Sequence, residues 1–82
     1  MTIKELKSGV KFSYDHGNYY SMECTEGGRW IICQFGRYIA SVESIGNRYI
    51  KAFTYVVNKK VTLKVDISKC IAMEEPAGAV IL

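Results

Sequence analysis

The sequence predicts an all-β protein, built as a small five- to six-stranded antiparallel barrel or a strongly curved sheet, with a short N-terminal helical turn. Two observations predict this class. From residue 10 onward the chain is rich in Val, Ile, Tyr, Phe and Thr, which favour strands. Glycine or asparagine interrupts this pattern about every 8 to 12 residues, which is the spacing of turns between short antiparallel strands.

The length and composition indicate one globular domain over residues 1–82. The chain is 49% hydrophobic and 23% charged and has a single proline, a balance typical of a folded protein. We expect an N-terminal turn over residues 2–9, the barrel over residues 10–75 and an apolar tail over residues 76–82. Because so short a chain buries only roughly 60–65% of its unfolded surface, a partner or a second copy is expected to support it.

The individual elements follow from local spacing. Ile3 and Leu6 lie three residues apart before Gly9, which indicates one turn of helix. Residues 10–14 alternate apolar and polar side chains, as a strand with one buried face does. Residues 15–18 have the composition of a tight turn. Further strands are expected at residues 19–25, 30–35, 38–43, 49–57, 61–65 and 70–73.

The connections between these strands are predicted from glycine and polar residues. Residues 26–29 are expected to close the second hairpin, and residues 45–48 and 58–60 to form later turns. Gly36 and Arg37 are interpreted as a kink or bulge, after which the preceding strand continues, because a glycine between two strand segments permits a bend. Residues 66–68 are expected to form a short turn before the last strand.

A weak internal repeat consists of a turn residue, an arginine, an aromatic residue and isoleucine. Its three copies are Gly28-Arg29-Trp30-Ile31, Gly36-Arg37-Tyr38-Ile39 and Asn47-Arg48-Tyr49-Ile50. Each copy is expected to open a strand. The repeat is either hairpin chemistry with solvated arginines, or a set of guanidinium and aromatic groups gathered at one end of the barrel. In that position they would stack on bases or bind carboxylates and phosphates.

Both ends of the predicted barrel resemble those of a known class of small proteins. The opening is Leu6-Lys7-Ser8-Gly9-Val10-Lys11-Phe12, and the closing stretch is Val65-Asp66-Ile67-Ser68-Lys69-Cys70-Ile71-Ala72-Met73-Glu74-Glu75. In their order of elements they resemble small SH3-like β-barrel proteins of phages, prophages and plasmids. The resemblance implies a 3₁₀-like turn before the last strand. It also implies a role either as a nucleic-acid-binding module or as an inhibitor that blocks a host or defence protein by surface contact.

Charge and cysteine content indicate the compartment and exclude several classes. The net charge of +3 and the pI near 8.8 permit weak attraction to nucleic acid or acidic protein. Lysines interrupt every apolar run near the N-terminus, so neither a signal peptide nor a membrane span is predicted. Cys24, Cys33 and Cys70 lack zinc spacing and are expected to be reduced and packed in the core of a cytoplasmic protein.

The sequence contains no recognisable catalytic constellation. His16 is the only histidine and falls in a predicted exposed turn, so no triad or histidine-rich metal site can be assembled. Glu74 and Glu75 are adjacent in sequence, and neighbours on a strand point to opposite faces. Gly27 and Gly28 lack the Lys-Ser/Thr that follows a phosphate-binding loop. We therefore predict no enzymatic activity, no metal and no cofactor.

The remaining signal is an aromatic stripe on the longest predicted strand. If Ile50, Ala52, Thr54 and Val56 face the core, the outward residues are Tyr49, Lys51, Phe53 and Tyr55. Aromatic side chains with a polar tip are enriched at the centres of protein interfaces, and they also stack on single-stranded nucleic acid. The alternative is that both faces of this strand are buried, one of them beneath another segment or a second subunit.

We therefore predict a non-catalytic binding protein that inhibits or modulates a host or defence protein by occluding its surface. The expected contact residues are Tyr49, Lys51, Phe53, Tyr55, Arg29, Trp30, Arg37 and Arg48. The alternative is a nucleic-acid-binding module in which these aromatics stack on bases and the arginines bind phosphates, extended by Lys59, Lys60 and Lys64. A homodimer or small homo-oligomer is a third interpretation, suggested by the apolar tail.

Overall fold

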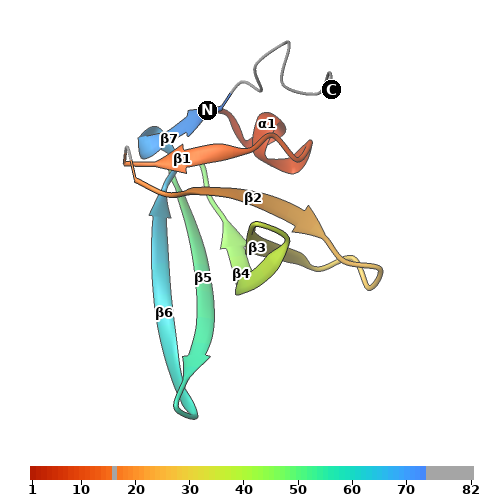
Figure 1. Ribbon diagram of the computed structural model, residues 1–82, viewed down its shortest axis with the longest axis vertical. Coiled ribbons are helices and arrows are strands. Elements are labelled where there is room, and N and C mark those ends of the chain that lie inside the picture. Colours follow the sequence, from red (N-terminus) through yellow and green to blue (C-terminus); the bar gives the residue numbers. More distant parts are fainter. Residues whose placement is uncertain (16, 74–82) are drawn as a thin grey trace, which may run out of the picture.

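The protein is a curled antiparallel sheet of seven strands with one short helix at its N-terminus (Figure 1). The computed structural model describes residues 1–15 and 17–73. The strand order is β6-β5-β4-β3-β2-β1-β7, and the curled sheet forms a half-barrel. The elements are α1 (Ile3–Lys7), β1 (Phe12–Tyr14), β2 (Tyr19–Cys24), β3 (Trp30–Gln34), β4 (Arg37–Ile45), β5 (Tyr49–Val56), β6 (Lys59–Asp66), the 3₁₀ helix η1 (Ile67–Lys69) and β7 (Cys70–Ala72).

The predicted all-β curved sheet with an N-terminal helical turn is confirmed, but the prediction of five to six strands is wrong. The difference arises at the supposed kink, where residues 30–43 form a hairpin. Gln34 and Arg37 are cross-strand partners, and Phe35 and Gly36 form the turn with φ values of 53° and 75°. Two successive positive φ values are typical of the tight turn that suits a hairpin, yet a phenylalanine in this region is uncommon. Gly36 suits this turn, but Phe35 does not, so the pair lacks the composition of an ordinary two-residue hairpin turn.

The hairpin of β5 and β6 projects from the rest of the molecule along its longest axis (Figure 1). Together with Arg48, which immediately precedes it, this hairpin is here called the arm (residues 48–66). Only Ile50 and Ala52 of β5 are buried, and the first four residues of β6 are exposed. Its turn is Val57–Asn58, with φ values of 50° and 63°, so that Val56 is paired with Lys59. The prediction of a turn at residues 58–60 is therefore wrong.

The turn of the arm contains a strained backbone position, Val57, whose exposed side chain gains little from packing. Val57 is β-branched, has a positive φ and is 88% exposed. We expect Val57→Asn to stabilise the protein by about 1 kcal/mol, because asparagine adopts the left-handed region at lower cost. Urea unfolding followed by circular dichroism measures the change. Val56→Asn, one residue earlier and in the extended strand, is the matched control and should give no gain; an equal gain in both variants would contradict the strain argument.

The core lies on the concave side of the sheet in two adjoining clusters. The larger one packs α1 and the 3₁₀ helix against the sheet, and the smaller one lies on β3, β4 and β5. Both share partly buried neighbours such as Tyr20, Val42 and Val65. Their buried members are Leu6, Phe12, Met22, Ile50, Ile67 and Cys70 in the larger cluster, and Ile32, Ala40 and Ala52 in the smaller.

A capping box starts the short helix α1. The Thr2 Oγ1 accepts a hydrogen bond from the Glu5 backbone N–H at 3.1 Å, and the Glu5 carboxylate accepts one from the Thr2 N–H at 2.9 Å. This pair satisfies two N–H groups that a helix N-terminus otherwise leaves without a partner. The hydrogen bond from the Thr2 backbone is the main reason that the pKa of Glu5 is lowered. The helix is thus short but well defined, and it places Leu6 over the core.

Asp66 joins the arm to the rest of the sheet. One oxygen of its carboxylate accepts hydrogen bonds from the Ser68 backbone N–H at 3.0 Å and the Ser68 hydroxyl at 2.7 Å. The other oxygen accepts one from Arg48 Nη2 at 3.4 Å. The backbone N–H of Asp66 donates to the Tyr14 hydroxyl oxygen at 3.1 Å. The bond to Tyr14 holds the base of the arm against β1. The Ser68 hydroxyl is the main cause of a lowered pKa at Asp66.

Some predictions concern residues outside the described range. His16, the pair Glu74 and Glu75, and the apolar tail over residues 76–82 lie there. Within the described range, no helix is long and apolar enough to cross a membrane.

Candidate binding face

The predicted aromatic stripe lies on the outer side of the arm, opposite the buried side chains of β5. Ile50 and Ala52 face the core, whereas Tyr49 and Tyr55 are 36% and 64% exposed. Lys51 is also exposed, and Phe53 is partly buried. The register places Tyr55 beside Lys60 and Lys51 beside Lys64. We call the outer surface formed by Tyr49, Lys51, Phe53, Tyr55, Lys60 and Lys64 the basic–aromatic face.

Cations already cover two of the rings on this face. Lys64 Nζ lies 4.1 Å from the centroid of the Tyr49 ring, and the Arg48 guanidinium carbon lies 5.2 Å from the same centroid. Lys60 Nζ lies 4.7 Å from the centroid of Phe53. The Phe53 and Tyr55 rings meet edge to face at 6.1 Å. Each exposed cation–π contact contributes about 0.5–1 kcal/mol, so the ammonium groups of Lys60 and Lys64 are held against the rings.

The arm also concentrates the positive charge of the chain. Residues 48–66 contain five of the eleven Lys and Arg residues and one of the eight acids, giving a formal charge of +4 against +3 for the whole chain. Lys51 and Lys64 are direct cross-strand partners, an arrangement of like charges that destabilises a sheet. A bound anionic group would offset this repulsion.

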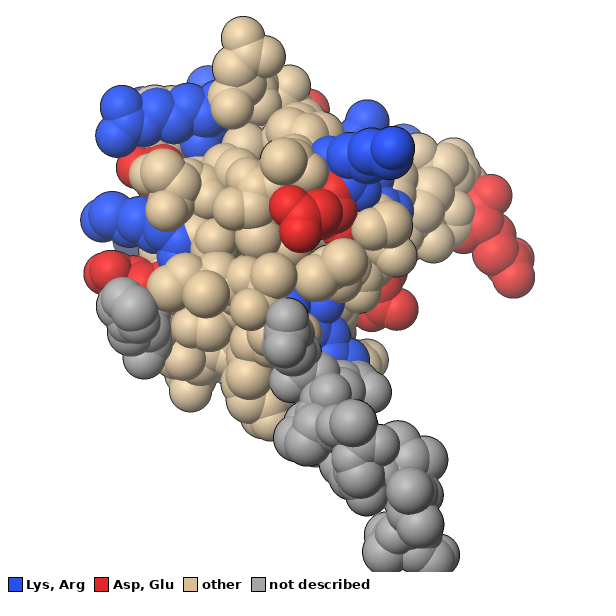
Figure 2. All heavy atoms as spheres, turned by 90° about the horizontal axis from the view of Figure 1, so that it is seen from above, with Lys and Arg blue, Asp and Glu red and all other residues tan. Residues whose placement is uncertain are grey.

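The opposite end of the molecule has a different charge distribution. Figure 2 shows that end, seen from above relative to Figure 1, with Lys and Arg lying beside Asp and Glu around an uncharged centre. In the part of this side that the described residues form, blue and red groups lie next to each other and no large area of one sign is visible. The charge pattern therefore distinguishes the arm as the surface suited to an anionic partner.

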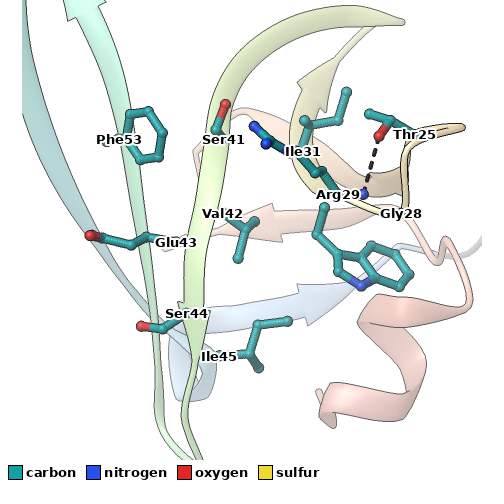
Figure 3. Close-up of a pocket in the computed structure, with 11 residues that line it drawn as sticks. Thr25, Gly28, Arg29, Ile31, Ser41, Val42, Glu43, Ser44, Ile45 and Phe53 are labelled. Carbon is teal, nitrogen blue, oxygen red and sulfur yellow. Dashed lines mark hydrogen bonds between the residues drawn. The ribbon is translucent and has the colours of Figure 1, made fainter.

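A cleft of about 510 Å³ adjoins this face where β4 separates from β3. The last β3–β4 partners are Ile31 and Ser41, and β4 continues to Ile45 beside β5 alone. Figure 3 shows β4 between Phe53 of β5 and the β2–β3 hairpin, with the Arg29 side chain extending towards Ser41. The Arg29 backbone N–H donates to Thr25 Oγ1 at 3.2 Å, which fixes the hairpin loop at the rim. The lining residues are Thr25, Gly28, Arg29, Trp30, Ile31, Ser41, Val42, Glu43, Ser44, Ile45 and Phe53.

The structure brings most of the predicted contact residues into one region but not all of them. Arg29, Trp30 and Phe53 line the cleft, and Phe53 also belongs to the basic–aromatic face. Because successive strands are antiparallel, β3 and β5 begin at one end of the sheet and β4 begins at the other. Arg37, the first residue of β4, therefore lies apart from Arg29 and Arg48.

The repeat thus marks strand starts and does not gather three guanidinium groups. Trp30, Arg37 and Tyr49 are the first residues of β3, β4 and β5. The expectation that each copy opens a strand is confirmed.

The sequence interpretation did not place the β4 side of the cleft or the lysines that cover the rings. The sequence predicts Ser41 and Glu43 as strand residues and ends this strand before Ser44, and nothing local indicates that β4 leaves β3 after Ser41. The positions of Lys60 and Lys64 could have been found from the register, had the turn been placed at residues 57–58.

The three cysteines are free, but they do not share one environment. Cys33 and Cys70 are buried, whereas Cys24 is exposed, so the expectation that it packs in the core is wrong. Burial, with a contribution from Glu23, raises the pKa of the Cys33 thiol to about 11. Burial is also the main reason that the pKa of Cys70 is raised. Within residues 1–15 and 17–73, no group of three His, Cys, Asp or Glu side chains could hold a metal ion.

These thiols should differ sharply in reactivity. At pH 8 we expect Ellman's reagent to modify Cys24 at least tenfold faster than Cys33 or Cys70, because Cys24 is exposed, whereas burial restricts access to the other two thiols and raises their pKa. Mass mapping after partial reaction identifies the modified residue, and Cys24→Ser should remove the fast phase. Addition of urea should make the remaining thiols react. Fast modification of Cys33 in the folded protein would contradict the assignment.

Comparisons with protein-family models, curated proteins and solved structures find no match. The resemblance to SH3-like barrel proteins of phages and plasmids therefore stays a prediction.

Proposed function

We propose that the protein is a non-catalytic binding protein that covers an acidic surface of a partner protein with its basic–aromatic face and the adjoining cleft. The observation that carries this proposal is the concentration of charge: the arm holds +4 in a chain of net +3. Aromatic side chains beside cations provide apolar contact area and charge complementarity together, which is the usual composition of energetically dominant interface residues. Occlusion of a host or defence protein is the form of this role that the resemblance implies.

The state of the rings favours a protein partner over base stacking. Stacking requires an open ring face, but Lys64 and Arg48 lie over Tyr49 and Lys60 lies over Phe53. Tyr55 is the ring of this face that projects furthest from the surface. Lysines held on aromatic faces remain available to carboxylates, so an acidic protein surface can be bound without rearrangement of the arm.

Charge reversal on the arm tests the proposal. Lys51→Glu/Lys64→Glu should lower capture of a protein partner from a nuclease-treated bacterial lysate at least tenfold. The matched control is Lys4→Glu/Lys69→Glu, which makes the same change in net charge at exposed sites on α1 and η1. Circular dichroism and thermal unfolding establish that both variants are folded. Equal capture by wild type and the arm variant, or equal losses in both variants, would contradict the proposal.

Nucleic-acid binding is the second candidate, favoured by the direct pairing of Lys51 with Lys64. Five arm cations in contact with phosphates would make the affinity fall steeply with salt, by roughly four powers of ten for a tenfold increase in concentration. A protein interface with an aromatic centre would lose much less. Titration of a labelled oligonucleotide with the protein at two salt concentrations distinguishes a nucleic-acid partner from a protein partner. Tight binding whose affinity falls steeply with salt would favour nucleic-acid binding over the first proposal.

A further inference from the structure

The strand β6 forms one edge of the sheet and pairs only with β5 among the described strands. A two-residue turn makes Val56 and Lys59 a hydrogen-bonded pair, and such pairs then alternate along an antiparallel ladder. The backbone groups of Val61, Leu63 and Val65 therefore point to β5. Those of the intervening residues, Lys60, Thr62, Lys64 and Asp66, point to the open edge.

The end of β6 confirms this alternation. The N–H of Asp66 points away from β5 and donates to the Tyr14 hydroxyl oxygen at 3.1 Å. The edge is closed at this point by β1. Lys60, Thr62 and Lys64 thus present a row of backbone groups that a further strand can pair with.

The inner side of the same edge opens into an apolar groove. A cavity of about 250 Å³ lies between β6 and the opposite wall of the half-barrel. Most of its lining is apolar or aromatic, and Lys64 of β6 also lies at its edge between Leu63 and Val65. The other lining residues are Phe12, Tyr14, Tyr20, Ile32, Ile39 and Ala40 from β1 to β4. Side chains of a strand added beside β6 would enter this groove at every second position.

The two sides of β6 have opposite chemistry. Lys60 and Lys64 lie on the outer side with the basic–aromatic face, while Leu63 and Val65 lie on the groove side. A residue placed beside another across a sheet points to the same side as its neighbour. An added strand would therefore meet lysine on one side and apolar residues on the other, in strict alternation.

We propose that the β6 edge binds an extended segment of the partner protein as an additional strand, and that this segment alternates acidic and apolar residues. The inference rests on the proposed function and names the part of the partner that is bound. Main-chain hydrogen bonds at Lys60, Thr62 and Lys64 supply affinity, and the alternating side chains supply specificity. Acidic residues pair with the lysines on the outer side, and apolar residues fill the groove.

Charge disfavours a second copy of the chain at this edge. An antiparallel pair of β6 strands that uses all three open residues is centred on Thr62. This register places Lys60 of each copy opposite Lys64 of the other, and like charges directly opposite are destabilising. An acidic segment replaces both repulsions by attractions.

The test uses synthetic peptides with the 8-residue length of β6. One peptide alternates glutamate and valine, and its control has the same composition with the glutamates and valines in two blocks. Fluorescence anisotropy with the full chain should show at least tenfold tighter binding of the alternating peptide. Thr62→Pro removes the edge N–H without removing a bond to β5 and should weaken binding at least tenfold, whereas Thr62→Ala should retain it. Equal binding of both peptides, or unchanged binding by Thr62→Pro, would overturn the proposal.

Hydrogen exchange gives a readout that does not depend on the variants folding. The alternating peptide should slow exchange of the Lys60, Thr62 and Lys64 amides, while the Val61 and Leu63 amides are already protected by β5. Unchanged exchange would overturn the proposal. Protection of the Lys60, Thr62 and Lys64 amides in the free protein would also overturn the proposal. Such protection would come from a second copy if light scattering detects a dimer, or from residues 77–82 if their removal abolishes the protection in a monomer.

The outcome separates this inference from the proposed function. Once a partner has been captured, Lys51→Glu/Lys64→Glu and Thr62→Pro can be compared in the same assay. Loss of the partner in the lysine variant but not in Thr62→Pro would retain the binding face and overturn strand addition. We expect the partner to be lost by both Lys51→Glu/Lys64→Glu and Thr62→Pro and to be retained by Thr62→Ala.

Discussion

Leu6→Ala is expected to lower the free energy of unfolding by about 2–5 kcal/mol, the usual cost of a buried leucine truncated to alanine. Leu6 is fully buried and is the residue by which α1 packs on the larger core cluster. For a domain of this size the loss corresponds to a fall in melting temperature of about 10–30 °C. Urea and thermal unfolding measured by circular dichroism give both quantities.

The control for this prediction is an apolar truncation outside the core. Val56→Ala removes methyl groups from a side chain that is 54% exposed at the end of the arm. It should change stability by less than about 0.5 kcal/mol, as surface substitutions usually do. If Leu6→Ala were no more destabilising than this control, the helix would not contribute to the core as the structure indicates.

Asp66→Ala is expected to cause the second-largest loss of stability, and the loss should depend on pH. The pKa of Asp66 is lowered from its ordinary value of 3.8, chiefly by the Ser68 hydroxyl. When the pKa of a carboxyl is lower in the folded state than in the unfolded state, it stabilises the folded protein. This stabilisation is fully present when the pH is above the unfolded-state pKa and is lost as the pH falls through the folded-state pKa. The variant should therefore melt well below wild type at pH 7, and the difference should narrow below pH 3.8.

The measurement is a series of melting curves from pH 7 down to the acid limit of the folded state. Glu26→Ala, an exposed acid in the β2–β3 connection, is the control and should show little difference at any pH. A pH-independent loss in Asp66→Ala would mean that the carboxylate does not stabilise the junction through its charge. In the variant, the backbone N–H of residue 66, which donates to the Tyr14 hydroxyl at the base of the arm, should also exchange its hydrogen faster.

The fold class could be predicted because it depends on local composition. Strand-forming residues and regularly spaced turns led to a curved antiparallel sheet, and Ile3 and Leu6 led to the helical turn. The number of strands could not be predicted, because it depended on whether the chain bends or reverses at residues 35–36. Phe35 adopts a positive φ that its side chain disfavours, and the pairing of β3 with β4 and the contact of its ring with Tyr19 hold it there.

The candidate site could be predicted only within one strand. The two-residue period of β5 put Tyr49 and Tyr55 on the side opposite Ile50 and Ala52, and the structure has this arrangement. The cleft depends on where β4 leaves β3, which is a property of the whole sheet. The positions of the lysines over the rings depend on the register of β6. If the turn is misplaced by one residue, the side chains of β6 are assigned to the opposite face of the sheet.

The uneven charge of the arm has a consequence for how the protein meets a partner. Residues 48–66 carry a formal charge of +4 in a chain of net +3, and the arm projects along the longest axis of a molecule 43 Å long, so the positive charge is displaced along that axis and gives the protein a dipole. In the field of an acidic surface this dipole turns the arm forward before contact, so a larger share of collisions has the productive orientation. The association rate constant should therefore be high at low ionic strength. It should fall as added salt shortens the range of the electric field, even where the final complex remains stable.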